Sequence, residues 1–480
     1  GLLRSPAPPS EIHATELQEA HLGIARKLQS GSSNSKVVVR HANIFDLDLH
    51  RDILWNASGP LLVVGNPPWV TSAELGTLGS DNLPGKTNLK KLGGMEAMTG
   101  SSNFVIAEYI WLKLIRELSA ERVTIALLCK TSVARNVLRF AFDAALPITR
   151  ASIRKIDAKK WFGASVEACL FCVEAGPGER YYEAEVYPSL SATVPESTMG
   201  FANGRLVRDI EGYRRFSFAD GACQMVWRQG LKHDAASVME LSRDESGGLR
   251  NKLGEIVDVE SEYVYPLLKG SDLFHQRLPG KFVIVTQRKL GESTKSLEWA
   301  APRLWNYLAA HADVFERRKS SIYRNKPSFA MFGIGDYSFS PYKVGVSGLR
   351  KTPRFGVIRP VDGRTVMLDD TSYFVACRSP EQAALLAALL NEPASIALIG
   401  AMVFLDAKRP ITKKLLQRID LKALLDKADK QTLQNRAEAC LARLDPPTSR
   451  QETSWPSPLE GLMFAGTAHD SGETQMSLEF

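Results

Sequence analysis

Four short and almost uninterrupted apolar runs constrain the first 180 residues more than any other feature. They lie at residues 37–39, 61–64, 123–128 and 168–173. Apolar runs of this length suit strands that are buried on both faces, as in a parallel sheet covered by helices. Residues 103–118 lie between two of these runs and repeat apolar side chains at helical spacing. This alternation predicts a doubly wound, Rossmann-like α/β domain over residues 1–185.

The second half of the chain has a different texture. Between about residues 185 and 380 the segments are shorter and richer in aromatic residues, Gly and Pro, with no regular alternation of strands and helices. Two helical patterns follow at 380–403 and 411–446, and the end of the chain is rich in Ser, Thr, Pro, Glu and Gly. We therefore expect an α+β domain over residues 186–430, and a C-terminal helix with a flexible tail over residues 431–480.

Bulk properties exclude several classes of protein. The sequence has no run of about 18 apolar residues and no apolar core of a signal peptide, so we expect a cytoplasmic protein. The net charge of +7 favours a polyanionic partner only weakly. Cys169 and Cys172 form a C-x-x-C inside an apolar run, which favours buried thiols over a zinc or redox pair. The histidines form no H-x-x-x-H cluster, so no metal site is predicted.

The motif that carries chemistry is Asn66-Pro67-Pro68-Trp69, which follows directly on the apolar run at 61–64. In open α/β sheets ligands bind at the carboxyl ends of strands, so the tetrapeptide stands where a site is expected. The two prolines restrict the backbone and remove two donors, leaving carbonyl groups free to accept hydrogen bonds. A plain turn is the alternative interpretation of Asn-Pro-Pro.

These groups suit methylation of an exocyclic amine. The adenine amino nitrogen is a weak nucleophile because its lone pair is delocalised into the ring. The amide oxygen of Asn66 and the carbonyl of Pro67 can accept its two N–H bonds, which stabilises the positive charge that develops as the nitrogen attacks a methyl group. Trp69 offers a ring face on which the base can stack.

Asn-Pro-Pro-aromatic resembles the signature of amino-methyltransferases, and the order of the other elements resembles the gamma class of DNA adenine-N6 methyltransferases of restriction–modification systems. The resemblance covers about residues 11–175 by motif and residues 260–420 by a looser pattern. It implies S-adenosylmethionine as the methyl donor and an adenine flipped out of double-stranded DNA as the acceptor. It also implies that the α+β half is a DNA target-recognition domain.

The resemblance assigns residues to the cofactor. Glu16, at the end of a segment similar to the family's second strand, is expected to accept hydrogen bonds from the ribose hydroxyls, with Leu17 against the cofactor adenine. A helix-capping role is the alternative for Glu16. Asn43, followed by Ile44, stands where the family has an Asp that binds the adenine amine, and Asp46 is a second candidate. The substitution at Asn43 weakens the match.

Two further segments match less specifically. Phe162, in Trp161-Phe162-Gly163, resembles the turn that supplies a second stacking face for the flipped base, opposite Trp69. Core packing is the rival interpretation of Phe162. Ser102 opens a segment comparable to one that contributes to the cofactor methionine pocket, although Ser102 is also a good helix N-cap.

The Gly-rich turn of the family, which should precede Glu16 by about 20 residues, is absent from the sequence. We expect the chain to be an N-terminally incomplete piece of a longer protein. Alternatively, an upstream segment or a partner polypeptide supplies this turn, or cofactor binding has been lost. No nuclease motif is evident, so DNA cleavage would also reside in such a segment or partner.

Basic clusters in the second half are candidates for DNA contacts. Residues 313–326 hold five basic and two acidic residues, and residues 341–354 hold four basic and no acidic residues. Cations interleaved with Ser, Asn and Tyr suit phosphate contacts and reading of base edges, although each cluster is also explained by a solvated surface. The candidate DNA-binding residues are Arg317, Arg318, Lys319, Arg324, Lys343, Arg350, Lys351, Lys408 and Arg409.

A looser pattern in the second half also resembles the family's recognition domain. It comprises Tyr263-Val-Tyr-Pro-Leu-Leu-Lys-Gly270, then Leu389-Leu390-Asn391, then Lys408-Arg-Pro-Ile-Thr412. The leading hypothesis is thus a DNA adenine methyltransferase of a restriction–modification or phage-defence system. The alternatives are a non-catalytic DNA-specificity subunit with a degenerate methyltransferase fold, or a methyltransferase for RNA adenine or protein glutamine. The long basic second half argues against the glutamine enzyme.

Overall fold

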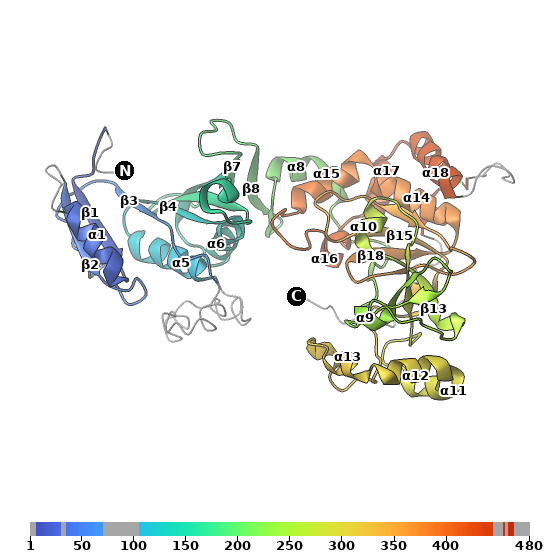
Figure 1. The fold of residues 1–480 in the computed structure, drawn as a ribbon. Helices are drawn as coiled ribbons and strands as arrows, with labels where there is room; N and C mark the ends of the chain where they lie inside the picture. Colours follow the sequence, from blue (N-terminus) through green and yellow to red (C-terminus); the bar gives the residue numbers. More distant parts are fainter. Residues whose placement is uncertain (1–5, 30–34, 71–104, 445–454, 457–458, 465–480) are drawn as a thin grey trace. The chain divides into compact units, whose positions relative to one another are not determined.

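The computed structural model describes residues 6–29, 35–70, 105–444, 455–456 and 459–464. The chain folds into two compact units, Gly1–Glu211 and Gly212–Phe480 (Figure 1). The division falls after the expected boundary at residue 185, because one strand crosses that boundary, two more follow it, and all three continue the sheet of the first unit. Helix α8 (Ile210–Phe216) spans the junction.

The first unit is built on a seven-stranded sheet. In sheet order its strands are β3 (Leu61–Gly65), β4 (Val123–Lys130), β6 (Ala168–Ala175), β5 (Ile148–Ile156), β7 (Ala184–Tyr187), β8 (Ser197–Ala202) and β9 (Arg205–Val207). Strands β3 and β4 are parallel, whereas β6 is antiparallel to both β4 and β5. The sheet is therefore mixed, whereas the apolar runs suggested a parallel sheet.

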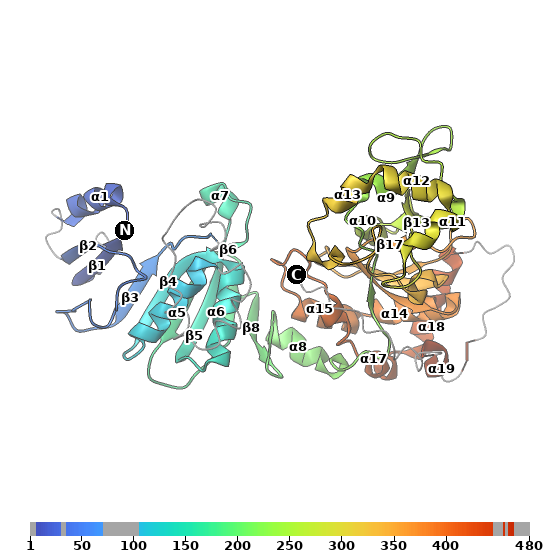
Figure 2. The same cartoon turned by 90° about the horizontal axis from the view of Figure 1, so that it is seen from below.

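Helices α5 (Ile106–Leu118) and α6 (Thr131–Asp143) pack on each other and on β4 (Figure 2). The indole of Trp111 on α5 lies 4.6 Å from the ring of Phe171 on β6, between centroids, and both side chains are fully buried. Along β4, buried and half-buried residues alternate. On β4 one face is thus buried and the other half-buried, and on β3 every residue is half-buried or exposed, unlike the two buried faces that the apolar runs predicted.

A smaller parallel sheet precedes the large one. It pairs β1 (Glu11–Glu16) with β2 (Lys36–His41), and α1 (Glu19–Gln29) connects them. The buried carboxylate of Glu11 accepts hydrogen bonds from the backbone N–H groups of Asn56 and Ala57, at 2.7 and 3.1 Å. The side-chain amide of Asn56 also donates to this carboxylate at 3.0 Å, and this bond, followed by the backbone bond of Asn56, lowers the pKa of Glu11 far below its usual range. These bonds tie the start of β1 to the segment that leads into β3.

The second unit contains two sheets. The five-stranded sheet has the order β12 (Leu249–Arg250), β11 (Glu240–Arg243), β14 (Lys281–Ile284), β13 (Val264–Leu268) and β17 (Met367–Leu368). The four-stranded sheet has the order β10 (Arg228–Gln229), β18 (Ser372–Cys377), β15 (Tyr342–Ser347) and β16 (Gly356–Ile358). Pairing is antiparallel throughout except between β13 and β17. The apolar face of each sheet must be buried against another element, and helices pack on these faces.

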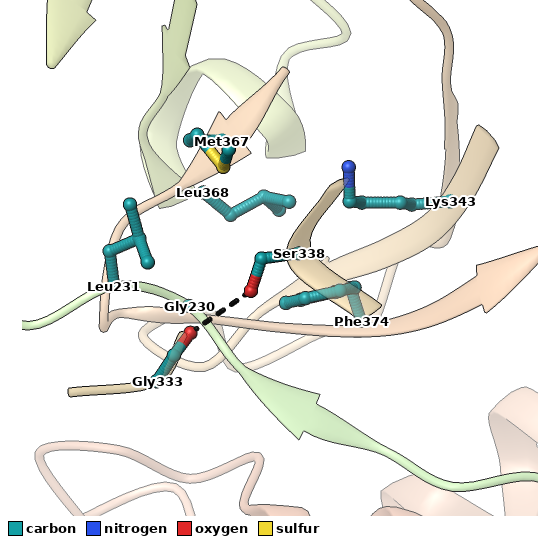
Figure 3. A pocket seen from close by; sticks show the side chains of 8 residues that line it. All are labelled: Gly230, Leu231, Gly333, Ser338, Lys343, Met367, Leu368 and Phe374. Atoms are coloured by element: carbon teal, nitrogen blue, oxygen red, sulfur yellow. Dashed lines mark hydrogen bonds between the residues drawn. The ribbon is translucent and has the colours of Figure 1, made fainter. Parts of the chain in front are cut away.

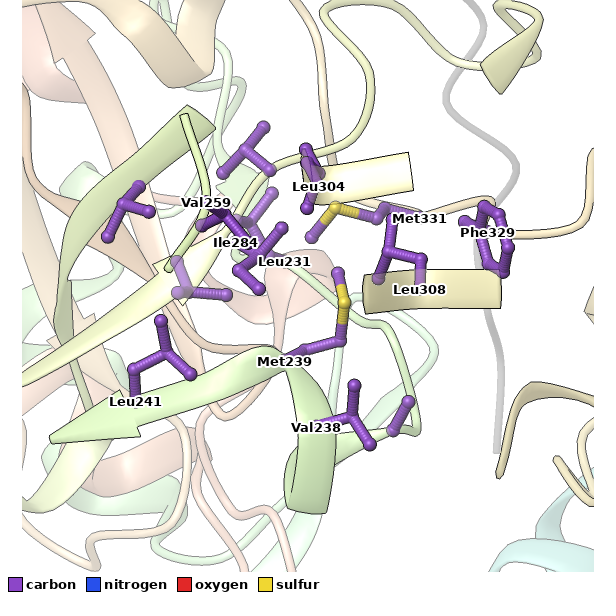
Figure 4. Close-up of a cluster of buried hydrophobic side chains, with 14 of the residues drawn as sticks. Leu231, Val238, Met239, Leu241, Val259, Ile284, Leu304, Leu308, Phe329 and Met331 are labelled. Atoms are coloured by element: carbon purple, nitrogen blue, oxygen red, sulfur yellow. The ribbon is translucent and has the colours of Figure 1, made fainter. Parts of the chain in front are cut away.

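Helix α12 (Pro302–Ala310) covers part of the five-stranded sheet. Leu304 and Leu308 of α12 join Met239, Leu241 and Ile284 in one buried cluster (Figure 4). The remaining short helices of this half are α9 (Ala236–Met239), α10 (Gly270–Phe274), α11 (Leu297–Ala300) and α13 (Ala312–Glu316). This mixture of helices and mainly antiparallel strands agrees with the α+β character expected for the second half.

The C-terminal part of the second unit is helical. Its helices are α14 (Pro380–Leu390), α15 (Pro393–Met402), α16 (Lys413–Leu416), α17 (Leu421–Lys427), α18 (Lys430–Leu444) and α19 (Leu459–Met463). The expected helix at 411–446 is thus three helices, and α18 packs on the almost completely buried α14 instead of standing apart. The expected flexible tail after residue 464 lies outside the described residues.

Among the described residues, no single helix is long and apolar enough to cross a bilayer. The pair α14 and α15, which is bent by 60°, reaches that length and composition only when the two helices are taken together.

Candidate active site

Asn66-Pro67-Pro68-Trp69 follows β3 directly, so the motif stands at the carboxyl end of a strand as predicted. The side chain of Asn66 is exposed, and Pro67 and Trp69 are half-buried. The indole N–H of Trp69 donates to the carbonyl of Leu128 near the end of β4, at 3.3 Å. The neighbouring strand therefore fixes how the tryptophan ring is turned.

The structure brings Trp69 and Phe162 together, although 93 residues separate them in the sequence. Their ring centroids lie 5.7 Å apart with the planes inclined at 76°, an edge-to-face contact. Phe162 ends the one-turn helix α7 (Ala158–Phe162), whose ends are held by an Asp157 side-chain cap and by Gly163 at φ 65°. The ring of Phe162 is 48% exposed, so packing in a core does not explain it.

The topology explains why these two rings meet. Strand β5 is antiparallel to β6, and β6 is antiparallel to β4, so β3, β4 and β5 all end at the same edge of the sheet. The segment after β3 carries Trp69, and the segment after β5 carries α7. The Thr131 N–H after β4 donates to the Glu167 carbonyl before β6, at 3.0 Å, which closes this edge between them.

The residues assigned to the cofactor lie at the ends of β1 and β2. The carboxylate of Glu16 accepts the N–H of Gln18 at 2.7 Å, and the N–H of Ala42 donates to the Glu16 carbonyl at 3.2 Å. The Glu16 carboxylate thus makes a local turn contact just before α1, and its other oxygen has no hydrogen-bond partner among the described residues. The side chain of Leu17 is exposed beside it.

Asn43 is also partly engaged. Its amide oxygen accepts the N–H of Phe45 at 3.2 Å, and Ile44 between them is half-buried. An amide oxygen has two lone pairs, so Asn43 retains capacity for one more donor. Phe45 is buried and meets Tyr109 of α5 edge to face at 5.5 Å, which ties this turn to the large sheet. Asp46, the second candidate, is exposed.

These residues fit the nucleoside part of S-adenosylmethionine: a carboxylate at a strand end, an exposed leucine and an amide with spare acceptor capacity.

Residues 71–104, which include Ser102, lie outside the described residues. Strand β3 pairs only with β4 among the described strands, and its residues Leu62 and Val64 are about half exposed.

Three predicted DNA contacts are instead held by the second unit itself. The ammonium group of Lys343 is buried and donates to the carbonyls of Ser340 and Val366, at 2.7 and 3.0 Å. Burial lowers the pKa of Lys343 to about 7. Its assignment as a phosphate contact is therefore wrong, because strand β15 turns the side chain inward.

Lys343 lines a small gap in the interior of this unit (Figure 3). The gap has no room for a water molecule, so it is a packing defect and not a ligand site. Its lining residues are Gly230, Leu231, Gly333, Ser338, Lys343, Met367, Leu368 and Phe374.

Arg318 and Arg409 are also engaged. The guanidinium of Arg318 donates to the carbonyls of Ala330 and Ser328, at 2.8 and 3.1 Å, and lies 3.7 Å from the centroid of Tyr323. Arg409 is paired with Asp370 at 2.9 Å. Both side chains are half-buried, so neither is the free phosphate contact that its cluster predicted.

The remaining predicted cations are accessible. Lys319, Arg324, Lys351 and Lys408 are exposed, and exposed Arg317 forms an ion pair with the neighbouring Asp313. Arg350 is half-buried, with its guanidinium 4.8 Å from the ring centroid of Phe274.

No family model matches the chain. A type II methyltransferase of Nostoc sp., M.NspV, is 34% identical over 417 residues, which are 86% of this chain and 86% of the relative. The chain belongs to the type II methyltransferases. The resemblance to methyltransferases of restriction–modification systems is thereby confirmed at this level.

A solved structure is similar in fold. The type IIL restriction–modification enzyme MmeI, solved in complex with DNA, matches with a TM-score of 0.53 at 13% identity. The match covers 94% of this chain and 60% of the MmeI chain, so this methyltransferase spans less than two thirds of that enzyme. The likeness supports a mixed α/β methyltransferase fold.

Three exposed residues next to Phe162 were not among the predicted site residues. Lys159, Lys160 and Trp161 are all exposed on α7, directly before Phe162. The sequence pattern that could have identified them is two lysines followed by two aromatic residues, a combination that suits nucleic-acid binding. The pattern was not placed at the end of a strand because β5, which has several polar residues, was not predicted.

Proposed function

We propose that this methyltransferase transfers the methyl group of S-adenosylmethionine to the N6 amine of an adenine flipped out of a specific duplex DNA sequence, in a restriction–modification or phage-defence system. One observation carries the proposal. The Asn66-Pro67-Pro68-Trp69 segment stands at a sheet edge where the indole of Trp69 meets Phe162. An amide acceptor beside two aromatic rings suits an amine on a planar base.

Asn66 and Pro67 act on the amine. The Asn66 side chain is exposed beside Trp69, and the Pro67 carbonyl is fixed by the following proline. Both oxygens accept N–H bonds and favour the positive charge that develops on the nitrogen, so they bind the transition state better than the ground state. Trp69, held by its bond to Leu128, supplies a ring face already in place.

Glu16, Leu17 and Asn43 would hold the nucleoside of S-adenosylmethionine, which supplies the electrophilic methyl group when it is bound. The carboxylate of Glu16 would accept ribose hydroxyls, and Leu17 would cover the adenine ring. Asn43, whose amide oxygen already accepts one N–H, would take the adenine amine as a second donor. Their place at the ends of two adjacent parallel strands supports this assignment.

We propose that a further strand and Gly-rich turn, from an upstream segment or a partner polypeptide, complete the cofactor site beside β3. Two features support this. Strand β3 has a free edge among the described strands, and Leu62 and Val64 on it are half exposed. A strand that carries the catalytic segment and leaves apolar residues uncovered is an unusual sheet edge. Val64→Lys should then lower both the cofactor affinity and the melting temperature of the full-length protein, because it places a charge where the added segment would pack.

The second unit would read the DNA. Exposed Lys319, Arg324, Lys351 and Lys408 are available for phosphates or base edges, whereas Lys343, Arg318 and Arg409 serve the fold. Polar loops carrying cations suit both kinds of contact.

The test is methyl transfer by the full-length protein. Unmethylated genomic DNA is incubated with S-adenosylmethionine labelled in its methyl group, and the labelled nucleosides are identified. We expect N6-methyladenine, and a loss of at least about 100-fold for Asn66→Ala with DNA binding retained. Asn306→Ala, at an exposed position of α12, is the matched control and should keep full activity.

Other outcomes separate the alternatives. Label in methylated cytosine would overturn the adenine assignment. Label in RNA or in protein glutamine would overturn the DNA assignment. DNA binding with no transfer to any of these would favour a non-catalytic specificity subunit.

A further inference from the structure

The exposed side chain of Trp161 is a feature that the base pocket does not use. Trp161 directly precedes Phe162 on α7 and is 64% exposed. Consecutive residues of a helix point about 100° apart, so the two rings cannot serve the same face. Phe162 turns toward Trp69, while Trp161 projects into solvent with the ammonium of Lys160 5.7 Å from its ring centroid.

Helix α7 holds this ring firmly although it has only one turn. The Asp157 carboxylate accepts the N–H of Lys160 at 3.0 Å, and its carbonyl accepts the N–H of Trp161 at 3.1 Å. Gly163, at φ 65°, returns its N–H to the Lys159 carbonyl at 3.1 Å. Ala158 anchors the turn in the core. These bonds fix the backbone that carries Trp161, and the exposed indole, with exposed Val166 on the same connection, leaves an apolar surface open to a partner.

The surroundings of Trp161 favour a polyanion. Lys159 and Lys160 are exposed, and neither forms an ion pair with another residue that the structure describes. Within residues 157–163 the one carboxylate is that of Asp157, which caps α7, and exposed Glu167 lies at the far end of the connection, directly before β6. Val166 adds a further exposed apolar side chain on the same connection. A planar ring flanked by two cations matches a stacked base flanked by its phosphates.

We propose that Trp161 is a wedge that enters the duplex beside the extruded adenine and stacks on the bases left behind, while Lys159 and Lys160 bind the flanking phosphates. The proposal rests on the proposed function. Removing a base from the stack leaves its neighbours uncovered, and an inserted side chain offsets that loss. Trp161 is adjacent in sequence to a ring of the base pocket, so the wedge and the pocket would act on neighbouring nucleotides.

The experiment compares two duplexes with the full-length protein. Both contain the recognition sequence mapped from methylated genomic DNA. In one the target adenine is paired, and in the other it faces an abasic site, so that it is already unpaired and costs less to extrude. On the paired duplex, Trp161→Ala should transfer methyl groups roughly 10- to 100-fold more slowly than the unaltered protein. On the abasic duplex, its rate should stay within about threefold of that of the unaltered protein. Trp161→Phe should recover most of the rate on the paired duplex.

Controls separate this role from a structural one. Trp299→Ala removes an even more exposed tryptophan from α11 and should change neither rate. Lys159→Gln with Lys160→Gln should weaken DNA binding and reduce the slope of log affinity against log salt by about one to two. An equal loss on both duplexes, or no loss on the paired one, would overturn the wedge.

The unaltered protein tests the proposed function in the same experiment. Transfer to another base of the duplex would overturn the adenine assignment. The ratio of the transfer rates on the two duplexes would still show whether Trp161 acts as a wedge. No transfer by the unaltered protein to either duplex would overturn both.

Discussion

The rings of Trp69 and Phe162 touch edge to face, with centroids 5.7 Å apart, although they come from the ends of different strands. Two rings in contact leave no slot for a base between them. Trp69 is fixed through its N–H by Leu128, whereas Phe162 is half exposed at the end of a single helical turn. We therefore expect Phe162 to move when a base enters and Trp69 to stay.

Phe162→Ala is accordingly predicted to impair function without impairing the fold. Methyl transfer to duplex DNA should fall roughly 10- to 100-fold, because one stacking face is lost. The melting temperature should stay within about 2 °C, since the exposed ring buries little apolar area. Phe162→Tyr retains the stacking face and should retain most of the activity. A fall in melting temperature that accounts for the lost activity would contradict this assignment.

Arg318 and Arg324 should respond differently although they lie in the same basic cluster. Arg318→Ala removes the donors of the Ala330 and Ser328 carbonyls, so the free energy of unfolding should fall by about 1–3 kcal/mol. Arg324→Ala, at an exposed side chain, should leave stability unchanged and reduce the salt slope of DNA binding by about one. Denaturant unfolding and DNA binding at several salt concentrations measure both. The opposite pattern would show that Arg318 contacts the DNA.

Lys343 should make stability depend on pH. Burial lowers the pKa of Lys343 to about 7 in the folded protein, compared with 10.5 for a free lysine. Between these values the unfolded chain holds a proton that the folded chain lacks, so the free energy of unfolding rises with pH by up to about 1.4 kcal/mol per unit. Below about pH 7 both states are protonated, and this contribution becomes constant.

The check is denaturant unfolding from pH 6 to 10. Lys343→Met should flatten the rise above pH 7 relative to the unaltered protein. Lys319→Met, at an exposed position, is the control and should leave the slope as it is. A slope that survives in Lys343→Met would assign the pH dependence to other groups.

Gly333 is predicted to tolerate no side chain. It has φ +69°, and a Cβ atom there would lie 2.3 Å from the carbonyl oxygen of Gly230. Gly363 has φ +71° but open space around it, so it isolates the cost of the backbone conformation. Gly363→Ala should cost about 1–2 kcal/mol of unfolding free energy. Gly333→Ala should cost clearly more, because the segments that cross there must separate. Equal losses would contradict the close approach.

The sequence by itself determined much of the first unit. The apolar runs at 61–64, 123–128 and 168–173 are strands, because apolar runs of four to eight residues are typical of strands and too short for most helices. The place of Asn66-Pro67-Pro68-Trp69 after a strand followed from local order alone. Strand β5 was not predicted from the sequence, because its more exposed face carries Arg and Lys, which obscure the apolar alternation.

Only the tertiary structure decided which side chains face each other and which face inward. The meeting of Trp69 with Phe162 depends on the antiparallel placement of β6, a pairing that no local pattern encodes. Lys343 lies in a basic cluster with exposed Lys351, and strand β15 alone turns it into the core. Local sequence specifies the period of a strand, whereas burial is set by the segments that pack against it, and these are distant in the chain.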